Sequence, residues 1–531
     1  MEKIIGIVII AVTALLLTLV GRRIFLIYQL SSYRARGVMN WLKITRFDYA
    51  VRYFALAFLG FISTFVYVAC FYKYLYVRYL GYLVFVGLCV LFLVLTGKEK
   101  NKVPLKFTAR MVRFHIVAFL LYLGFATGLY YLVSLFSVKL SYSVLTLLPI
   151  TVPIIVTAAH FIALPFETLN NYSYKVRAKA KLDSMPEMIR IGITGSYGKT
   201  TAKVMLAQML QKKYRVCFSQ KSYNTPMGIC KVVNNDLPDD SQVFVAEMGA
   251  RFKGDIEELT KIVKPNYGII TAIGNQHLET FGSLKNIMDT KFELVENLCT
   301  GGMSFFNGDS KPNVELFERA KESKQITGGE DVQNAAVTYK NVEQTTDGVR
   351  FTLVFKSGEY DVRTKLLGRH IPSLIAVCAA VAFELGVTPQ DIVETCEAIE
   401  PVPHRLELMK SGEMVIIDDA YNANVEGAEN ALLALAGFED RTRVIITPGL
   451  VELGKEEKQA NIDLGEKIGK YCDVAFLLGA RAQQLKEGAL KGGMQEENIK
   501  IVQTVAEAVE QLRALEGKTA VLFENDLPDN Y

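Results

Sequence analysis

Long apolar runs dominate the first third of this 531-residue sequence, and they constrain its fold more than any other feature. Each approaches the length of about 20 residues that crosses a bilayer as a helix. The five runs lie near residues 3–21, 51–71, 78–96, 115–136 and 142–164. Residues 1–165 are therefore predicted to form an α-helical membrane domain with about five transmembrane helices.

The basic residues between these runs predict the orientation of the domain. The first run has no small-x-small cleavage site after it, so it is interpreted as a retained helix and not as a signal peptide. Lys and Arg concentrate in the first and third loops, whereas the second and fourth loops contain few. Cytoplasmic loops are enriched in Lys and Arg. The expected location is the inner (cytoplasmic) membrane, with the N-terminus outside and the residues after 165 in the cytoplasm.

Composition excludes some classes of function and leaves others open. The mean hydropathy of +0.22 is high, but the residues after 165 resemble an ordinary soluble α/β sequence. A net charge of +4 is too small to indicate nucleic acid as a partner. Eight cysteines without a C-x-x-C pair favour reduced thiols in a cytosolic compartment. His115 and His160 are interpreted as interfacial residues of the apolar region and not as a functional intramembrane site.

A phosphate-binding loop is predicted directly after a short buried strand at 188–194. Its residues are Gly195, Ser196, Tyr197, Gly198, Lys199, Thr200 and Thr201, and a helix is predicted to follow at 202–212. In such a loop, backbone N–H groups and the positive helix end hold phosphates, the lysine neutralises them, and a hydroxyl binds Mg²⁺. Ile193 replaces the first glycine of the general pattern, so the loop is the shorter T-G-x-x-G-K-T-T. The strand before it and the helix after it disfavour a chance turn.

The segment from Thr194 to Thr201 resembles the ATP loop of the Mur ligase family, and further motifs follow in the family's order over about 340 residues. The resemblance is closest to the MurF branch, which adds D-alanyl-D-alanine to a UDP-muramoyl tripeptide. It implies a P-loop central ATP-binding domain at 188–401 and a Rossmann-like C-terminal domain at 402–531. A basic cytoplasmic linker is expected at 166–187.

The resemblance also implies ligands for Mg²⁺. Thr200 matches the hydroxyl ligand of the loop. Glu247 ends a predicted strand at 242–247, and the carboxyl end of a parallel strand faces the ligand crevice of such folds. His277, within H-L-E-T-F-G-S, matches the ligand of a second Mg²⁺. Lys291 matches a lysine that the family carries as a carbamate beside that second metal.

Two further elements are implied to contact the nucleotide. Asn307 and Asp309 match an Asn-x-Asp element near it. The family's G-R-H-N-x-x-N element recurs from Gly368, but Ile371 and Leu374 occupy its two asparagine positions, which contact the adenine end of ATP in relatives. The base is therefore expected to be bound differently here.

The C-terminal part contains the remaining candidates. Arg405 matches a nucleotide-contacting arginine at the hinge into the last domain. The sequence from Asp418 to Asn424 is close to the MurF signature D-D-x-Y-N-A-N. By the resemblance, Asp419 and Asn422 approach as the domains close and orient the amine substrate or the phosphates.

Taken together, these matches imply an ATP-dependent acid–amino acid ligase of cell-wall precursor synthesis. It would form an amide bond through an acyl phosphate, with ATP and Mg²⁺ as cofactors. The expected partners are a muropeptide-type carboxylate substrate, an amino acid or dipeptide amine donor, and the lipid bilayer. The expected catalytic residues are Lys199, Lys291, His277, Asp419 and Asn422.

Several alternatives remain open. Family members usually begin with a soluble UDP-binding domain, whereas apolar runs occupy that place here, so a lipid-linked acceptor is a second hypothesis. A membrane-attached ligase with another product, such as a poly-γ-glutamate synthetase, is a third. A non-catalytic ATP-binding membrane scaffold would be expected to lack metal ligands, yet Thr200, Glu247, His277 and Lys291 are present. An ATP-driven transporter is disfavoured because the sequence has no second ATPase signature of that kind.

Overall fold

A computed structural model describes residues 2–31, 33, 38–39, 41, 48–70, 79–97, 104–219, 222–321, 323–421 and 424–525. The described residues form two compact units, and the boundary between them falls between Tyr172 and Ser173. The N-terminal part is called unit 1 and the part from Ser173 onward unit 2.

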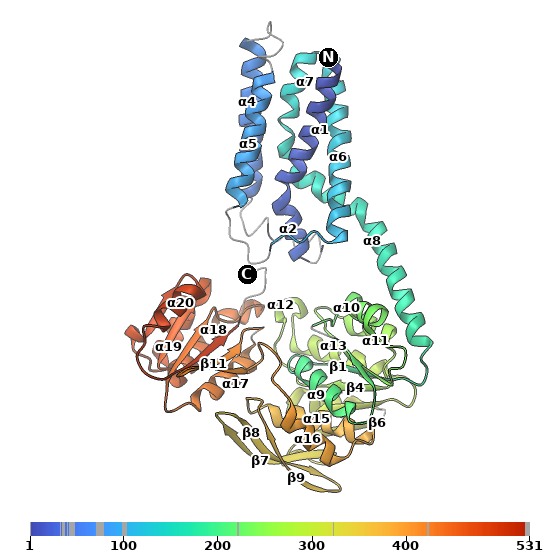
Figure 1. Cartoon of the computed structure of the whole chain (residues 1–531), viewed down its shortest axis with the longest axis vertical. Coiled ribbons are helices and arrows are strands. Elements are labelled where there is room, and N and C mark those ends of the chain that lie inside the picture. Colours follow the sequence, from blue (N-terminus) through green and yellow to red (C-terminus); the bar gives the residue numbers. More distant parts are fainter. Residues whose placement is uncertain are drawn as a thin grey trace. The chain divides into compact units, whose positions relative to one another are not determined.

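Unit 1 is a bundle of apolar helices (Figure 1). Its elements are α1 (Glu2–Val20), α2 (Arg22–Leu30), α4 (Asp48–Cys70), α5 (Leu80–Gly97), α6 (Ala109–Ser134), α7 (Val138–Leu145), η2 (Leu148–Thr151) and α8 (Val152–Asp183), which continues into unit 2. Four segments of the described chain are long and apolar enough to cross a membrane, and α1 with α2, bent by 41°, would be a fifth. Their number and positions agree with the five predicted runs.

The last apolar run and the predicted linker differ from their expected form. Pro149 of this run lies in η2, whereas Pro165, directly after the run, lies inside the continuous helix α8. Residues 166–183, expected to be a linker, continue this helix. Many of the basic residues that predict the orientation lie outside the described residues, so the orientation stays a prediction. These are Arg34, Arg36, Lys43, Arg46, Lys73, Arg78, Lys98, Lys100 and Lys102.

The two histidines of unit 1 are packed against aromatic rings. The His115 ring stacks on Phe25 with centroids 3.9 Å apart, and its Nδ1 forms a 2.8 Å hydrogen bond with the Met111 carbonyl oxygen. The His160 ring stacks on Tyr28 at 4.6 Å. Both contacts are of a structural kind.

Unit 2 opens with a nine-stranded sheet in the order β2-β3-β1-β4-β5-β6-β7-β8-β9. The strands are β1 (Ile189–Thr194), β2 (Val216–Phe218), β3 (Val243–Glu247), β4 (Tyr267–Ile270), β5 (Met303–Asn307), β6 (Ser323–Gly329), β7 (Val337–Thr345), β8 (Gly348–Phe355) and β9 (Gly358–Thr364). Pairing is parallel from β2 to β7 and antiparallel from β7 to β9. β7, β8 and β9 thus form two antiparallel hairpins, and Asp347 lies in the turn between β7 and β8.

Helices cover the sheet on both faces, as all-parallel strands require. They are α9 (Lys199–Gln211), α10 (Pro226–Lys231), η3 (Val232–Asp236), α11 (Asp255–Val263), α12 (Leu278–Phe281), α13 (Leu284–Glu296), α14 (Lys311–Arg319), α15 (Ile371–Glu384) and α16 (Pro389–Ala398). α15 is buried along nearly its whole length and packs beside α9 in the largest apolar cluster of the unit. The predicted strand, loop and helix at 188–212 are confirmed as β1 and α9.

The end of α8 is part of unit 2. Ala178 and Leu182 are fully buried in an apolar cluster with residues of β3 and α11. The guanidinium of Arg190, on β1, donates to the carbonyl oxygens of Leu182 and Met185. These contacts fix the helix end to the sheet.

A second sheet follows in the order β10-β11-β15-β12-β13-β14. Its strands are β10 (Glu407–Ser411), β11 (Met414–Asp419), β12 (Thr442–Thr447), β13 (Val474–Leu478), β14 (Ile499–Val502) and β15 (Thr519–Glu524). Its helices are α17 (Val425–Ala436), η4 (Gly454–Glu456), α18 (Glu457–Tyr471), η5 (Gly479–Arg481), α19 (Ala482–Lys491), η6 (Glu496–Asn498) and α20 (Val505–Leu512). Only β10 is antiparallel to its neighbour. The expected pair of α/β domains is therefore present.

Candidate active site

The predicted phosphate loop lies between the carboxyl end of β1 and the start of α9. Gly195 has φ +151° and Gly198 has φ +76°, and a Cβ on Gly195 would lie 2.1 Å from the Thr271 hydroxyl. Only glycine fits such a backbone without strain. The Ser196 N–H donates to the Ala272 carbonyl oxygen at 2.6 Å. The loop is thus tied to the segment after β4.

The lysine of this loop is folded over its own backbone. The Lys199 amine donates to the carbonyl oxygens of Gly195 (2.7 Å) and Ser196 (2.8 Å). Burial lowers the pKa of Lys199 to about 8, although the nearby Glu247 carboxylate raises it. Thr200 and Thr201 lie in the first turn of α9. A bound phosphate would replace the two carbonyl oxygens as acceptor for the amine.

Glu247 ends β3, the strand beside β1, and its carboxylate is almost completely enclosed. It is 1% exposed, and its two oxygens accept from Lys203 Nζ at 3.1 Å and from Asn224 Nδ2 at 2.9 Å. Burial raises the pKa of Glu247, but Lys203, Lys199 and the Asn224 amide together outweigh burial and keep it below its ordinary value. The carboxylate is therefore charged at neutral pH.

Lys291 lies on α13 with its side chain buried. It is 3% exposed, and burial, followed by the charge of Lys199, holds its pKa well below the ordinary value. The acids Asp255 and Glu293 act in the opposite direction but more weakly. Burial thus favours the uncharged amine, which is the form that can attack CO₂ to give a carbamate.

His277 lies in the loop after β4 and contacts the C-terminal domain, which contains the second sheet. Its Nδ1 pairs with a carboxylate oxygen of Glu452, and both side chains are about one-sixth exposed, at 16% and 17%. Burial lowers the pKa of His277 despite this carboxylate. The imidazole is neutral at neutral pH, as a metal ligand must be.

These residues form a donor set that fits Mg²⁺. The set combines the Glu247 carboxylate, the Thr200 hydroxyl and the neutral imidazole of His277, and Mg²⁺ prefers oxygen donors with few protein ligands. Each Glu247 oxygen has a second lone pair beyond its present hydrogen bond. A carbamate on Lys291 would add oxygen donors. Lys199 lies close enough to each of the others for electrostatic interaction: the Glu247 carboxylate raises the pKa of Lys199, and the Lys199 charge lowers the pKa of His277 and of Lys291.

Asn307 ends β5, Asp309 follows two residues later, and both side chains form hydrogen bonds. The Asn307 side-chain oxygen accepts from the Ser373 hydroxyl at 2.7 Å. The Asp309 carboxylate accepts from the Gly329 N–H at 3.0 Å and from the Tyr339 hydroxyl at 2.8 Å. Both side chains are held within their own domain by these bonds.

The two departures from the family element lie in the core. Ile371 and Leu374 are 3% and 4% exposed, and Leu374 packs directly under Gly198 of the phosphate loop. Apolar contact at this place replaces the amides expected from the family element.

The two acids at the end of β11 have separate partners. Asp419 accepts from the Leu406 N–H at 3.3 Å, and burial raises its pKa to about 6 although Arg405 lowers it. The Arg405 guanidinium lies over the Tyr421 ring, 4.3 Å from its centroid. Asn422, the other expected catalytic residue of this domain, lies outside the described residues.

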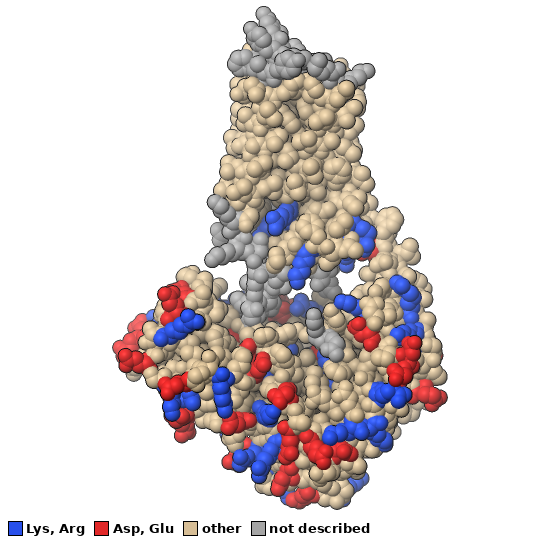
Figure 2. All heavy atoms as spheres, viewed as in Figure 1, with Lys and Arg blue, Asp and Glu red and all other residues tan. Residues whose placement is uncertain are grey.

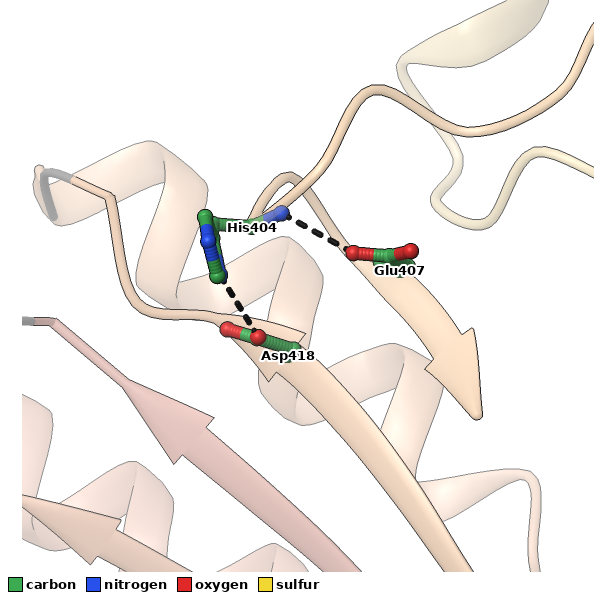
Figure 3. Close-up of side chains that lie close together, drawn as sticks. All are labelled: His404, Glu407 and Asp418. Atoms are coloured by element: carbon green, nitrogen blue, oxygen red, sulfur yellow. Dashed lines mark hydrogen bonds and ion pairs between the residues drawn. The ribbon is translucent and has the colours of Figure 1, made fainter. Parts of the chain in front are cut away.

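The neighbouring acid Asp418 belongs to a three-residue cluster at the hinge (Figure 3). The His404 Nδ1 pairs with Asp418 at 2.7 Å, and the His404 N–H donates to Glu407 at 3.1 Å. His404 and Leu406 both have positive φ, at +62° and +48°. The bonds satisfy the cluster internally, so it braces the strained hinge backbone.

Two residues of the site were not predicted from the sequence. Lys203 is a charged residue on the buried face of α9, one turn after Lys199, and that position was the available signal. Glu452 lies in the loop between β12 and η4, and no sequence feature indicates that it would contact His277.

Comparisons with known proteins agree with this arrangement. Residues 193–382 match the Mur ligase middle domain, and residues 404–524 match the Mur ligase, glutamate ligase domain. The UDP-N-acetylmuramoyl-tripeptide–D-alanyl-D-alanine ligase of Bacillus subtilis (strain 168) is 30% identical over 318 residues, 59% of this chain and 67% of the relative. The enzyme of the same name from Escherichia coli (strain K12) is 28% identical over 277 residues, 52% of this chain and 61% of the relative. The chain thus spans about three-fifths to two-thirds of these relatives.

Solved structures show the same fold. MurF from Acinetobacter baumannii has a TM-score of 0.62 at 24% identity, covering 68% of this chain and 78% of that chain. A MurF ligase from Thermotoga maritima in complex with ADP has a TM-score of 0.60 at 22% identity, covering 68% and 81%. The chain therefore belongs to the Mur ligase family, whose members are ATP-dependent enzymes that form carbon–nitrogen bonds.

Proposed function

We propose that the protein is a membrane-anchored, MurF-like ligase that joins a muropeptide carboxylate to D-alanyl-D-alanine or a similar amine. The observation that carries the proposal is the electrostatic interaction of Lys199, in the loop after β1, with Glu247, His277 and Lys291, which lie at the end of β3, after β4 and on α13. The names of the curated relatives supply the substrate class.

The chemistry takes place in two steps. A carboxylate oxygen of the acceptor attacks the γ-phosphorus of ATP, the bond to the bridging oxygen breaks, and ADP leaves. The donor amine then attacks the acyl carbon, phosphate leaves, and the nitrogen loses a proton as the amide forms. Because the first step brings anions together, stabilisation by cations dominates the catalysis.

The residues of the chain divide this task. Lys199 would exchange its two backbone acceptors for phosphate oxygens. Thr200 and Glu247 would hold one Mg²⁺, and His277 with carbamylated Lys291 a second; bound Mg²⁺ would neutralise charge on the transferred phosphoryl group. Asp419 and Asn422 would orient the amine when the two domains close, which also excludes water. Asn307, Asp309 and Arg405 would support the nucleotide.

Unit 1 is proposed to cross the cytoplasmic membrane five times, with α1 and α2 as one bent span. This count places the loop after α2, the loop after α5 and the end of α8 on one side, and the first two are the basic loops. Unit 2 would then lie in the cytoplasm. An anchor of this kind suits an acceptor carried on a lipid as well as one carried on UDP.

The ligase proposal is tested by phosphate release from Mg-ATP with the full-length protein in detergent. D-alanyl-D-alanine is supplied with either UDP-muramoyl tripeptide or the same muropeptide on a lipid carrier, beside a Lys199→Ala control. We expect release that requires both substrates and disappears in the control. If phosphate is released with neither the UDP-linked nor the lipid-linked acceptor supplied in turn, the proposed substrate class is wrong. A preference for one of the two acceptors identifies the carrier of the substrate.

The orientation is tested with native cysteines. Cys70 is exposed at the end of α4, and Cys299 is partly exposed in unit 2. We expect a membrane-impermeant maleimide to label Cys70 in intact cells and Cys299 only after lysis. Labelling of Cys299 in intact cells would contradict the cytoplasmic placement of unit 2.

A further inference from the structure

One loop of the second sheet's domain docks on the loop that carries His277. The docking loop follows β12 and includes Glu452 and Glu456. Besides the His277–Glu452 pair, the Glu279 N–H donates to the Glu452 carbonyl oxygen at 3.3 Å. The Asn275 side-chain amide donates to Glu456 at 3.4 Å. Residues of both loops line a common small pocket with Asn424.

The two residues that meet at the centre of this contact both have strained backbones. His277 has φ +56° and Glu452 has φ +63°, in the left-handed region that non-glycine residues rarely adopt. Such strain persists only where the surrounding structure holds the residue in that conformation, often at functional sites. The backbone of each loop is therefore held in the form that brings the imidazole and the carboxylate together.

The hydrogen bond fixes which imidazole nitrogen carries the proton. A carboxylate only accepts, so the neutral ring places its proton on Nδ1 and keeps the lone pair on Nε2. Ligating histidines are commonly set in this way, with the second nitrogen donating to a carboxylate. Glu452 is itself held by Arg251, whose guanidinium lies 3.6 Å from the other carboxylate oxygen.

We propose that Glu452 is a positioning residue that sets His277 for metal binding and, because it lies on the other domain, does so only when the domains are closed. This inference rests on the proposed role of His277 as a metal ligand. Metal affinity at His277 would then depend on closure, and a closed enzyme would hold its second metal more tightly than an open one. The same link means that metal binding at His277 favours closure.

The test measures metal binding without turnover. Full-length protein in detergent is titrated with Mn²⁺, an oxygen-preferring substitute for Mg²⁺ that is visible by EPR, in the presence of adenylyl imidodiphosphate. The variants are Glu452→Gln, Glu452→Asp and His277→Ala. Glu456→Gln is the matched control, because it removes a carboxylate of the same loop that contacts Asn275 and not His277. Nucleotide affinity and the thermal midpoint report whether each variant is folded.

We expect Glu452→Gln to weaken the His277-dependent Mn²⁺ site about tenfold or more, the usual effect of losing such a partner, with nucleotide affinity unchanged. Glu452→Asp, which keeps the carboxylate charge on a shorter side chain, should lie between the wild type and this variant, and Glu456→Gln should match the wild type. Equal losses in Glu452→Gln and Glu456→Gln would overturn the inference. A normal Mn²⁺ site in Glu452→Gln, together with a lost site in His277→Ala, would also overturn the inference but would leave the proposed function standing. Unchanged Mn²⁺ binding in His277→Ala would overturn both the inference and the proposed role of His277 as a metal ligand.

Discussion

The two units place their large apolar side chains in opposite ways. In unit 1, Phe54, Ile154 and Leu169 are 57%, 70% and 68% exposed, whereas among the described residues of unit 2 the most exposed large apolar side chain is Val505, at 50%. Figure 2 shows the matching charge pattern, with few charged side chains on the helical bundle and many on unit 2. Unit 1 thus has the apolar surface expected of the proposed membrane anchor, whereas unit 2 buries most of its large apolar side chains in its own core.

The units also differ in how they hold buried acids. Glu167 of α8 is 5% exposed, but its partners Arg110 and Arg113 are partly exposed, at 30% and 46% of their side chains. Glu247 and its partner Lys203 are both 1% exposed. A fully enclosed ion pair is costly to desolvate and is weak support for stability in itself. The enclosed charges of unit 2 are thus better explained by chemistry than by folding.

The largest effect is expected on activity, when the buried amine of Lys291 in unit 2 is removed. Lys291→Met removes the group proposed to become a carbamate ligand and should lower kcat at least about a hundredfold, in the range seen on loss of one electrostatic contact to the transition state. Phosphate release measures it. Lys285→Met, on the exposed face of the same helix, is the control and should retain activity. Full activity in Lys291→Met would remove this residue from the site.

The next effect is on folding. Lys203→Met leaves Glu247 enclosed without its cation and should destabilise unit 2 by about 3–5 kcal/mol. The thermal midpoint measures the loss. Adding Glu247→Gln to the same chain should recover part of it, because no uncompensated charge then remains. A midpoint equal to the wild type in Lys203→Met would show that the pair is not enclosed.

A pH effect of intermediate size is expected at the end of β15. Burial raises the pKa of Glu524 to about 8, above its ordinary 4.5, and its neighbour Asp419 on β11 adds to the rise. A raised pKa means that this contribution to stability is present below pH 4.5 and is lost as the pH rises toward 8. Glu524→Gln should therefore match the wild type near pH 4 and be more stable at pH 8.5, by up to about 5 kcal/mol. Parallel pH profiles of the thermal midpoints would contradict this.

The smallest effect is expected in unit 1. Arg113→Met removes a 2.7 Å contact to Glu167, but the arginine is nearly half exposed and Arg110 remains, so the loss should be below about 1 kcal/mol. The thermal midpoint in detergent, compared with that of Lys203→Met, measures the difference between the two regions. Equal decreases of the thermal midpoint in Arg113→Met and Lys203→Met would show that the two ion pairs contribute equally to stability.

The sequence predicts those parts of the structure that depend on neighbours in the chain. The apolar runs, the β1–loop–α9 unit and the turn at Asp347 all follow from local patterns. The contact between the end of α8 and the sheet of unit 2 does not follow from a local pattern. Ala178 and Leu182 are flanked by lysines, so the sequence of this segment resembles that of an exposed basic helix. Lys203 and Glu452 were missed for a related reason: their partners lie 44 and 175 residues away, and only the fold brings them together.

The most direct test of the central claim follows the oxygen of the acceptor carboxylate. The full-length protein is given Mg-ATP, D-alanyl-D-alanine and a muropeptide acceptor whose reacting carboxylate is labelled with ¹⁸O, and the released phosphate is analysed by mass spectrometry. An acyl-phosphate ligase transfers one ¹⁸O to each phosphate as the amide forms, and this is the result we predict. Amide formation with unlabelled phosphate would contradict the account.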